Sequence, residues 1–388
     1  MTETMPLAPW AKRKDIKALI KALGEGNARF VGGAVRDTLL GLEVKDVDVA
    51  TPLVPRDVIA RLDAADIRSV PTGIDHGTVT AILPKGPVEI TTLRHDVSTD
   101  GRRATVAFAQ DWREDAARRD FTINALYADP VTLEIQDFFG GLDDLKQRHV
   151  RFIGDARQRI REDHLRILRY FRFQARFGSQ PADEEAESSC SELAATLKGL
   201  SRERVGMETM NLLALADPAP TVARMEQLGV LPVILPEADP AALARLITEE
   251  QRQHIAPDPI RRLAALLPAD VSLAEQVAAR FRLSSAQKKR LARAAARGSE
   301  AGNAYALAYR LGREQALDRL LIAGVDATPL KDWEIPLFPL KGGQIVDRGV
   351  KAGPEVARIL QTVEALWIEE GFPPEERVLA LLEETLAA

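Results

Sequence analysis

The sequence predicts an α+β chain in which an α/β head precedes a remainder made only of helices. Up to about residue 145, short β-branched runs such as TVTAIL and VEITTL alternate with helical pieces and turns. After about residue 150 the strand patterns nearly vanish, and amphipathic segments rich in Ala, Leu and Arg follow, separated by proline-bearing joints such as ADPAP. Because single cores rarely grow past about 250–300 residues, the 388 residues are expected to form two or more domains.

The composition excludes several classes of protein. No apolar run approaches the roughly 20 residues that a membrane helix needs, and the N-terminal MTETMPLAPWAKRKD lacks the apolar core of a signal peptide. Cys190 is the only cysteine, so no internal disulfide is expected. These features predict a cytoplasmic protein without a membrane partner. The net charge of −5 argues against bulk electrostatic coating of nucleic acid, so any RNA contact must be local.

Residues 30–51, FVGGAVRDTLLGLEVKDVDVAT, combine a glycine pair with two aspartates. A strand is expected to end at Val31, after which Gly32 and Gly33 let the backbone turn sharply into a helix. A helix N-terminus presents free N–H groups to an anion such as a triphosphate, and Arg36 adds a guanidinium about one turn later. By itself, a glycine pair before a helix is typical of an ordinary turn.

The two aspartates follow in KDVDVA, whose alternation of apolar and polar residues predicts a strand. On a strand Asp46 and Asp48 share a face, with Cα atoms about 7 Å apart. Carboxylates at this spacing can bridge Mg²⁺, which prefers oxygen ligands and phosphate co-ligands. Glu89 lies on another predicted strand, PVEITTLR, and becomes a third carboxylate of the site if the two strands are neighbours. Exposed strand-edge aspartates and a surface glutamate are the alternatives.

A polar cluster, AARRDFTINALYAD, occupies residues 116–129 and precedes a segment expected to be an apolar helical face. Its polar residues would either cap this helix, or Arg119 and Asn124 would hold the sugar and phosphates of a nucleotide. The segment alone does not decide between these two roles.

Residues 159–178, RIREDHLRILRYFRFQARFG, have the apolar spacing of a helix. On this helix Asp163 and Arg166 share a face, and Arg169 and Arg172 continue the row. Asp163 beside Arg166 offers an acceptor next to a donor. This pair complements the amino group and ring nitrogen of cytosine or adenine, and it does not complement the carbonyl and N–H of uracil or guanine. The alternative is an intrahelical ion pair, worth about 0.2–0.5 kcal/mol.

Four ordered motifs carry a family resemblance: GGAVRD with DVD, RRDFTINAL, EDHLRILRYFRF, and LSRERV at residues 200–205. Through them, roughly the first 210 residues resemble the class II tRNA nucleotidyltransferases, the CCA-adding enzymes, and the related bacterial poly(A) polymerases. The resemblance implies a polymerase-β-like nucleotidyltransferase head, a helical neck that recognises the base, a helical body and a helical tail that binds tRNA. The expected ranges are 1–148, 149–215, 216–330 and 331–388.

The resemblance also implies roles for individual residues. Asp46 and Asp48 would bind Mg²⁺, and Glu89 matches the family's additional acidic position, so these three are the candidate catalytic carboxylates. The implied nucleotide-binding residues are Gly33, Arg36, Arg119, Asp163, Arg166, Arg169 and Arg172. Within this set Asp163 and Arg166 match the protein template that selects the incoming base.

The implied function is template-independent addition of C, C and A to the 3′ end of tRNA, from CTP and ATP with release of pyrophosphate. A poly(A) polymerase, or an enzyme that adds only CC or only A, remains the alternative. Residues 93–108 resemble the family's mobile loop, with a turn at Asp100-Gly101 and basic Arg102 and Arg103, and retention of this loop favours addition of the terminal A.

Two segments of the C-terminal half are candidates for tRNA contact. Residues 337–360 resemble the family's tail element, with Gln344 where relatives often carry an aspartate. The run RFRLSSAQKKRLARAAAR, residues 280–297, holds seven basic residues and no acid. It is expected either to contact the tRNA backbone or to be a solvated helix face. The sequence makes no prediction of oligomeric state.

Overall fold

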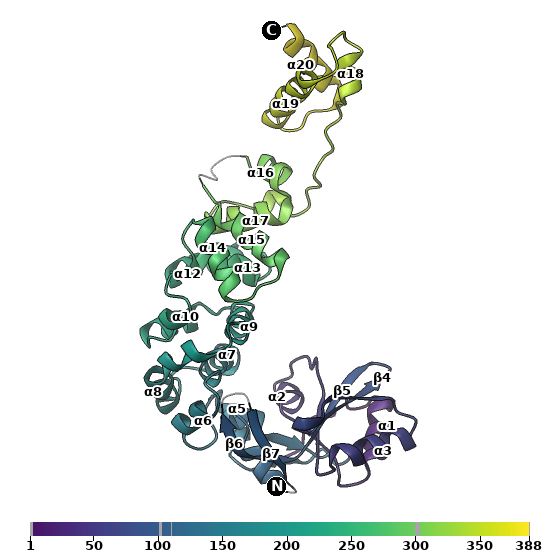
Figure 1. Cartoon of the computed structure of the whole chain (residues 1–388), viewed down its shortest axis with the longest axis vertical. Coiled ribbons are helices and arrows are strands. Elements are labelled where there is room, and N and C mark those ends of the chain that lie inside the picture. Colours follow the sequence, from purple (N-terminus) through teal and green to yellow (C-terminus); the bar gives the residue numbers. More distant parts are fainter. Residues whose placement is uncertain (1–2, 101–102, 110, 299–302, 388) are drawn as a thin grey trace. The chain divides into compact units, whose positions relative to one another are not determined.

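The protein is described by a computed structural model that covers residues 3–100, 103–109, 111–298 and 303–387. It divides into two compact units, Met1–Pro236 and Glu237–Ala388, each treated by itself (Figure 1). The first unit holds strands and helices, and every regular element described in the second unit is a helix. The predicted α+β class is therefore confirmed. The four predicted domain ranges stay predictions, and the boundary between the two units falls inside the predicted body, 216–330.

A seven-stranded sheet forms the centre of the head in the described part of the chain, with strand order β3-β4-β5-β2-β1-β8-β9. The strands are β1 (Arg29–Val31), β2 (Asp48–Thr51), β3 (Ser69–Gly73), β4 (Thr78–Leu83), β5 (Gly86–Thr92), β8 (Leu126–Ala128) and β9 (Ile135–Asp137). β2 and β5 run parallel, and the other neighbouring strands are antiparallel. β2 is central, so residues at its start are supported by a strand on each side.

The strand predicted over KDVDVA begins later than expected. β2 starts at Asp48, which pairs with Val31, the last residue of β1. Because the chain turns away after Val31, the backbone that precedes Asp48 has no β1 residue to pair with. Asp46 therefore lies outside the strand and is exposed. The prediction that Asp46 and Asp48 share one strand face is wrong for this reason.

Five helices accompany the sheet: α1 (Lys14–Leu23), α2 (Gly33–Leu39), α3 (Pro55–Ala64), α4 (Trp112–Ala117) and α5 (Gly141–Gln147). α1 and α3 pack against each other and against β4, and α2 packs against β1 and β8 (Figure 1). α1 buries Ile16, Leu19 and Leu23, the apolar stripe expected for an amphipathic helix. The contacts of α2 hold β1, the strand that precedes the glycine pair and is paired with β2.

The segment after RRDF is a strand rather than the predicted helix. Thr122–Asn124 forms a single 3₁₀ turn, and Leu126–Ala128 forms β8, all three of whose residues are buried. A short apolar run that is buried on both faces lacks the alternation of apolar and polar residues that would identify a strand. The spacing of its apolar residues therefore does not distinguish a strand from a helix.

The predicted loop at residues 93–108 contains a hairpin. β6 (Arg94–Asp100) pairs antiparallel with β7 (Arg103–Phe108) and forms a separate two-stranded sheet. Gly101 of the predicted Asp100-Gly101 turn and the basic residue Arg102 lie outside the described residues. Whether the hairpin has the mobility of the family's loop stays a prediction.

Within the described residues of the first unit, six further helices follow: α6 (Ala156–Glu162), α7 (Arg166–Phe177), α8 (Glu184–Glu192), α9 (Arg202–Leu213), α10 (Ala219–Gln227) and α11 (Leu231–Ile234). The helix predicted over residues 159–178 is interrupted, because α6 ends at Glu162 and α7 begins at Arg166. Between them Asp163 is extended, with φ −150° and ψ 104°. Its carboxylate accepts the N–H of Leu165 at 3.1 Å, a local bond that competes with helix formation.

The second unit consists of helices in its described part: α12 (Pro240–Arg252), α13 (Pro259–Leu266), α14 (Val271–Arg280), α15 (Ser285–Ala295), α16 (Ala304–Leu311), α17 (Arg313–Ile322), α18 (Gly342–Val346), α19 (Pro354–Glu369) and α20 (Glu375–Ala387). One apolar cluster includes Leu246 and Leu320, and another, near the C-terminus, includes Val363 and Trp367. Across the residues described in both units, no helix has the length and apolar character to cross a membrane.

A buried ionic cluster holds α12 against α13. Glu250 is 2% exposed and accepts from Arg261 and Arg262, each at 2.8 Å. Removing one member of a buried ion pair leaves an uncompensated charge and typically costs about 3–5 kcal/mol. We expect Glu250→Ala to destabilise the second unit by this amount, measured by calorimetric unfolding of the full chain. Exposed Glu275, 4.0 Å from Lys288, is the matched control, and Glu275→Ala should change stability by less than about 1 kcal/mol. Equal shifts for the two variants would contradict the expectation.

Candidate active site

The glycine pair forms a tight connection between β1 and α2. Gly32 has φ +67°, a conformation that residues with a side chain rarely adopt. Its N–H bonds to the carbonyl of Leu126 at 3.2 Å, and a Cβ built on it would lie 3.5 Å from Nη1 of Arg119. Gly33, the first residue of α2, would place a Cβ 3.6 Å from Nη2 of Arg36. The turn therefore brings the glycine backbone close to the guanidinium groups of Arg119 and Arg36.

Two of the three predicted carboxylates lie side by side. Asp48 of β2 and Glu89 of β5 are register partners in the parallel pair, and registered neighbours project to the same face of a sheet. Asp48 is half-buried and Glu89 is exposed. The strand adjacency on which the Glu89 prediction depended is thus present, while Asp46 lies before β2, near enough for its charge to act on Asp48.

The surroundings of Asp48 disfavour the ionised form of its carboxyl group. Burial and the neighbouring charge of Glu89 raise the pKa of Asp48 to about 6, and Asp46 acts in the same direction. Arg119 opposes these effects, so its guanidinium lies close enough to stabilise the carboxylate. A half-buried carboxylate with two like-charged neighbours is a favourable place for a cation.

The donor chemistry fits a divalent metal, although the carboxylates do not form a complete cage. In the described chain, no group of three or more His, Cys, Asp and Glu side chains is arranged to hold a metal ion. Asp48 and Glu89 offer carboxylate oxygens from neighbouring strands, and exposed Asp46 lies two residues before Asp48. A hard cation that keeps water and phosphate ligands suits such an open site.

Arg119 is fixed between the glycine turn and the sheet. It donates from Nε to the hydroxyl of Tyr127 at 3.1 Å and from Nη2 to Asp115 at 3.1 Å. Burial opposes its charge, but Tyr127 and Asp115 together raise the pKa of Arg119 above its ordinary value, so the guanidinium stays charged. Asp115 and Tyr127 were missed by the sequence analysis. Asp115 lies three and four residues before Arg118 and Arg119, the helical spacing that could have identified it.

Arg36 lies in a buried polar cluster. Only 6% of the residue is exposed, and its guanidinium donates to Asp37 at 2.8 Å and to the side-chain oxygen of Asn124. It also stacks over the ring of Phe177, 4.2 Å from the ring centre. The predicted contact between Arg36 and a triphosphate is therefore not preformed, and this role stays a prediction.

Asp163 and Arg166 flank the break between α6 and α7, and each is held by a different partner. Asp163 accepts from Nη2 of Arg204 at 2.7 Å. Arg166 donates to Glu162 at 2.7 Å and to the main-chain carbonyls of Arg159 and Arg118, at 2.8 and 3.2 Å. They are therefore not the simple intrahelical pair that the alternative interpretation described.

Arg169 and Arg172 continue the row on α7, as predicted, and both are engaged. Arg169 donates from Nη2 to Asp120 at 2.5 Å, and Arg172 donates to Glu208 at 2.6 Å. Asp120 also accepts from Asn124 at 2.9 Å. Although burial raises it, the pKa of Asp120 is held below its ordinary value by Arg169 and Asn124. These bonds join the RRDF motif to the neck helix, a connection across 49 residues that local patterns do not reveal.

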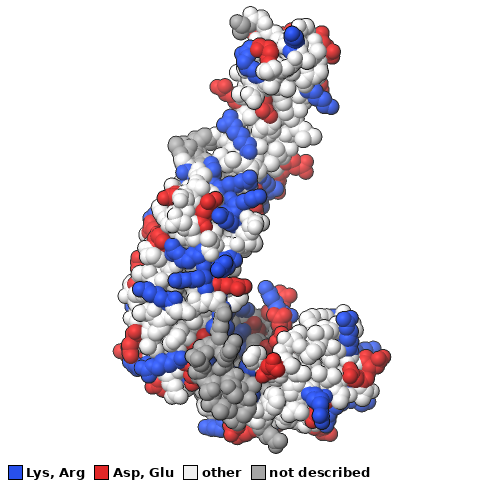
Figure 2. All heavy atoms as spheres, viewed as in Figure 1, with Lys and Arg blue, Asp and Glu red and all other residues white. Residues whose placement is uncertain are grey.

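The basic run at residues 280–297 is only partly available to a ligand. Arg280 pairs with Glu237, Arg290 pairs with Asp318, and Arg297 donates to two main-chain carbonyls. Its exposed cations include Arg282, Lys289 and Arg293. Figure 2 shows Lys and Arg side chains gathered over helices of the second unit. Contact with tRNA through this run stays a prediction. Gln344 is the third residue of α18 (Gly342–Val346), and its side chain accepts the N–H of Lys341 at 2.8 Å.

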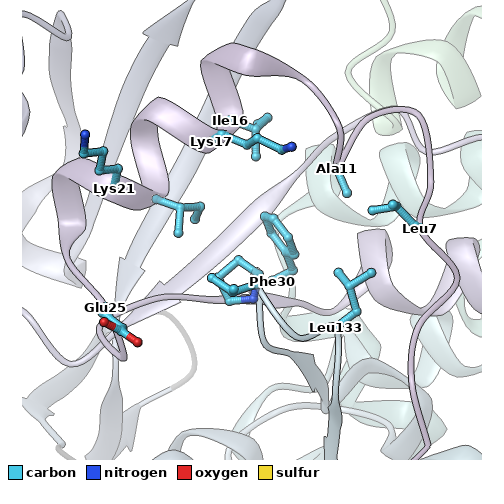
Figure 3. Close-up of a pocket in the computed structure, with 11 residues that line it drawn as sticks. Leu7, Ala11, Ile16, Lys17, Lys21, Glu25, Phe30 and Leu133 are labelled. Atoms are coloured by element: carbon cyan, nitrogen blue, oxygen red, sulfur yellow. The ribbon is translucent and has the colours of Figure 1, made fainter.

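One hollow of the head lies apart from these residues. It measures about 640 Å³ and is lined mainly by apolar side chains of the N-terminal segment, α1 and the β8–β9 turn, including Leu7, Ile16, Phe30 and Leu133 (Figure 3). None of the predicted site residues lines it. This hollow is therefore separate from the residues that the sequence predicts for the site.

Two family models match the chain, one within the first unit and one that continues a few residues past its boundary at Pro236. Residues 28–151 match the poly A polymerase head domain, and residues 182–242 match the probable RNA and SrmB-binding site of polymerase A.

Among curated proteins, the chain is 36% identical over 361 residues to "CCA tRNA nucleotidyltransferase 1, mitochondrial" of Danio rerio, covering 87% of this chain and 83% of that protein. It is 40% identical over 229 residues to the CCA-adding enzyme of Lactococcus lactis, covering 57% of this chain and 55% of that protein. The crystal structure of the Bacillus stearothermophilus CCA-adding enzyme in complex with CTP superposes with a TM-score of 0.71 at 25% identity. This match covers 96% of the present chain and 98% of the other.

Proposed function

The chain belongs to the family of CCA tRNA nucleotidyltransferases, and from this we propose that it adds C, C and A to the 3′ end of tRNA. CTP and ATP are the substrates, and pyrophosphate is released. The observation that carries the proposal is the registered pair Asp48 and Glu89, set beside a glycine turn and the charged guanidinium of Arg119. This arrangement matches the needs of phosphoryl chemistry, which depends mainly on positioning and on charge stabilisation.

Asp46 and Asp48 are proposed to hold Mg²⁺, with Glu89 as an additional catalytic carboxylate. Nucleotidyltransferases of this family generally use a divalent metal, and Mg²⁺ is proposed because the donors are all carboxylate oxygens. When bound, the ion supplies charge neutralisation at the phosphates and activation of the attacking hydroxyl. Crowding of like charges at Asp48 supports this assignment.

The nucleotide is proposed to bind between the glycine turn and the neck. Gly33 would present its backbone to the phosphates, and the fixed guanidinium of Arg119 would stabilise their charge. Arg36 would contribute to the same region by helping to hold the glycine turn in its conformation. The 3′ hydroxyl of the tRNA would attack the α-phosphorus of the bound CTP or ATP, and the β- and γ-phosphates would leave as pyrophosphate.

The base is proposed to be read by Asp163 and Arg166, with Arg169 and Arg172 completing the nucleotide pocket. An aspartate acceptor beside an arginine donor complements the pairing edges of C and A. Fixed partners on both side chains support this role, because an ordered acceptor and donor discriminate better than mobile ones.

The alternatives are poly(A) synthesis, favoured by the names of the matching family models, and addition of CC only or A only. Purified protein should be incubated with tRNA ending at the discriminator base, with CTP and ATP singly and together, and the product ends sequenced. We expect CC from CTP alone, and CCA followed by arrest from both nucleotides. An extended A tract would identify a poly(A) polymerase, and arrest after CC with both nucleotides present would identify a CC-adding enzyme. A tRNA ending in CC, supplied with ATP, serves as the control for A addition alone.

A cytoplasmic location stays a prediction, and several relatives are named as mitochondrial proteins.

A further inference from the structure

The apolar hollow of the head has the size of a small-molecule site. Its volume of about 640 Å³ falls within the roughly 300–1,000 Å³ that ligand pockets span. Its lining comes from three parts of the chain: the segment before α1, α1 itself, and the turn between β8 and β9 (Figure 3). Because folded elements form its walls, the hollow is present before a ligand binds, as is usual for such sites.

Apolar side chains at the rim of the hollow face water. Leu7 is 54% exposed and Val131 is 77% exposed, whereas Phe30, which also lines the hollow, is 1% exposed. The apolar body of a ligand would cover Leu7 and Val131. Removal of apolar surface from water is the main favourable contribution to binding of this kind.

Two lysines of α1 add positive charge to this apolar lining. Lys17 and Lys21 are four residues apart and therefore share a face of the helix, and both are exposed residues that line the hollow. In the part of the chain that the structure describes, no ion pair joins either ammonium group to an acid. Glu25 also lines the hollow, and Figure 3 shows it on the opposite side from Leu7. An anionic group is therefore favoured beside the lysines, with the apolar part of the ligand directed toward Leu7 and away from Glu25.

The hollow lies on the other face of the sheet from the predicted carboxylates. Phe30 lines the hollow, and the side chain of the next residue on β1, Val31, points to the opposite face. Val31 is registered with Asp48, and registered neighbours share a face. A ligand in the hollow would therefore not compete with a nucleotide bound at Asp48, so the hollow is a second site.

We propose that this hollow binds an apolar organic anion. Its alkyl or aryl body lies against Phe30 and Leu7, and its carboxylate or phosphate contacts the ammonium groups of Lys17 and Lys21. The size of the hollow, its apolar lining and two lysines without an acidic partner each favour this class of ligand. A cationic amphiphile would instead meet two like charges, and a neutral one would gain nothing from them. The inference is independent of the proposed function.

The test is isothermal titration calorimetry of the full chain with probes that share an octyl body and differ in the headgroup. Octanoate and octyl phosphate are the anions, octan-1-ol is the neutral probe and octyltrimethylammonium is the cation, each used below its critical micelle concentration. Exposed ion pairs are each worth a factor of up to about five in affinity. We therefore expect octanoate or octyl phosphate to bind about fivefold or more tightly than octan-1-ol, and the cation to bind most weakly. The stronger of the two anions identifies the headgroup that the site prefers.

Variants locate the binding site in the hollow. The double variant Lys17→Met, Lys21→Met should bind the preferred anion no more tightly than octan-1-ol. Lys14→Met, which changes an exposed lysine of α1 outside the hollow, is the matched control and should bind as the wild type does. Val131→Asp places a negative charge at the exposed rim, so it should weaken binding of the anion more than binding of octan-1-ol.

Three results would overturn the proposal. They are no binding of either anion by the wild type, an anion bound no more tightly than octan-1-ol, and an affinity for the anion that the double variant retains. Saturating CTP should leave binding of the anion unchanged, because the two sites lie on opposite faces of the sheet. Displacement of the anion by CTP would assign it to the nucleotide site and would equally refute the hollow as its location. None of these results depends on whether the chain extends tRNA, so the proposed function is tested separately.

Discussion

Asp48→Ala is expected to abolish incorporation of both CTP and ATP. Asp48 is the carboxylate that β1 and β5 support on both sides, next to Glu89. Charge stabilisation by a bound metal is worth several kcal/mol, and about 1.4 kcal/mol corresponds to a tenfold change in rate. The loss should therefore be at least about 10³-fold for either nucleotide. Asp46→Ala is expected to have the same effect if the loop before β2 brings that carboxylate to the metal.

The folded state should tolerate the Asp48→Ala change. The substitution removes a half-buried charge that is repelled by Glu89 and Asp46, so the unfolding temperature should not fall. Titration with Mn²⁺ should show weakened metal binding in the variant. Asp63→Ala, at an exposed position of α3, is the control and should retain both activity and metal binding. Retained nucleotide incorporation by Asp48→Ala would remove Asp48 from the proposed metal site.

The second large effect is expected at the base-reading pair. Asp163→Ala and Arg166→Ala should each lower the preference for C and A over U and G by about 10- to 100-fold, since each removes a charged hydrogen-bonding group. Addition of the nucleotides should continue, because neither residue contacts the carboxylates of β2 and β5. Sequencing of tRNA ends formed from equimolar mixtures of the four nucleotides measures the preference directly.

A matched control for this experiment is Arg161→Ala, an exposed arginine of α6 two residues before Asp163. It should leave nucleotide choice unchanged. If Asp163→Ala and Arg166→Ala incorporate C and A as selectively as the wild type, the base is read elsewhere and the template role is refuted.

The fold class was predictable because its signals are local. β-branched runs and turn residues mark the head, and amphipathic periods mark the helices that follow. The failures occurred where pairing or side-chain bonding decided the structure. Asp46 lies outside β2 because β1 ends at Val31, and Asp163 leaves the helix because its carboxylate bonds to the backbone of Leu165.

The candidate site was predictable in its residue types and less so in its contacts. The sequence suggested Glu89 as a partner of Asp48 only on the condition that their strands are adjacent. It contained no sign that Arg36 would bond to Asn124, 88 residues away, or that Arg204 would bond to Asp163, 41 residues away. Such long-range bonds depend on how the helices pack, which the spacing of charges along the chain does not encode.

The hydrogen bonds that join the head to the neck should affect how accurately the added base is selected at raised temperature. Arg169 reaches Asp120, Arg176 reaches Asp37, and Arg166 reaches the carbonyl of Arg118. Because some of the same arginines are expected to read the nucleotide, loosening this joint also disturbs the reading surface. Local opening generally costs less free energy than global unfolding. Errors in the added base should therefore rise with temperature before the protein melts, so that fidelity is the first property to be lost.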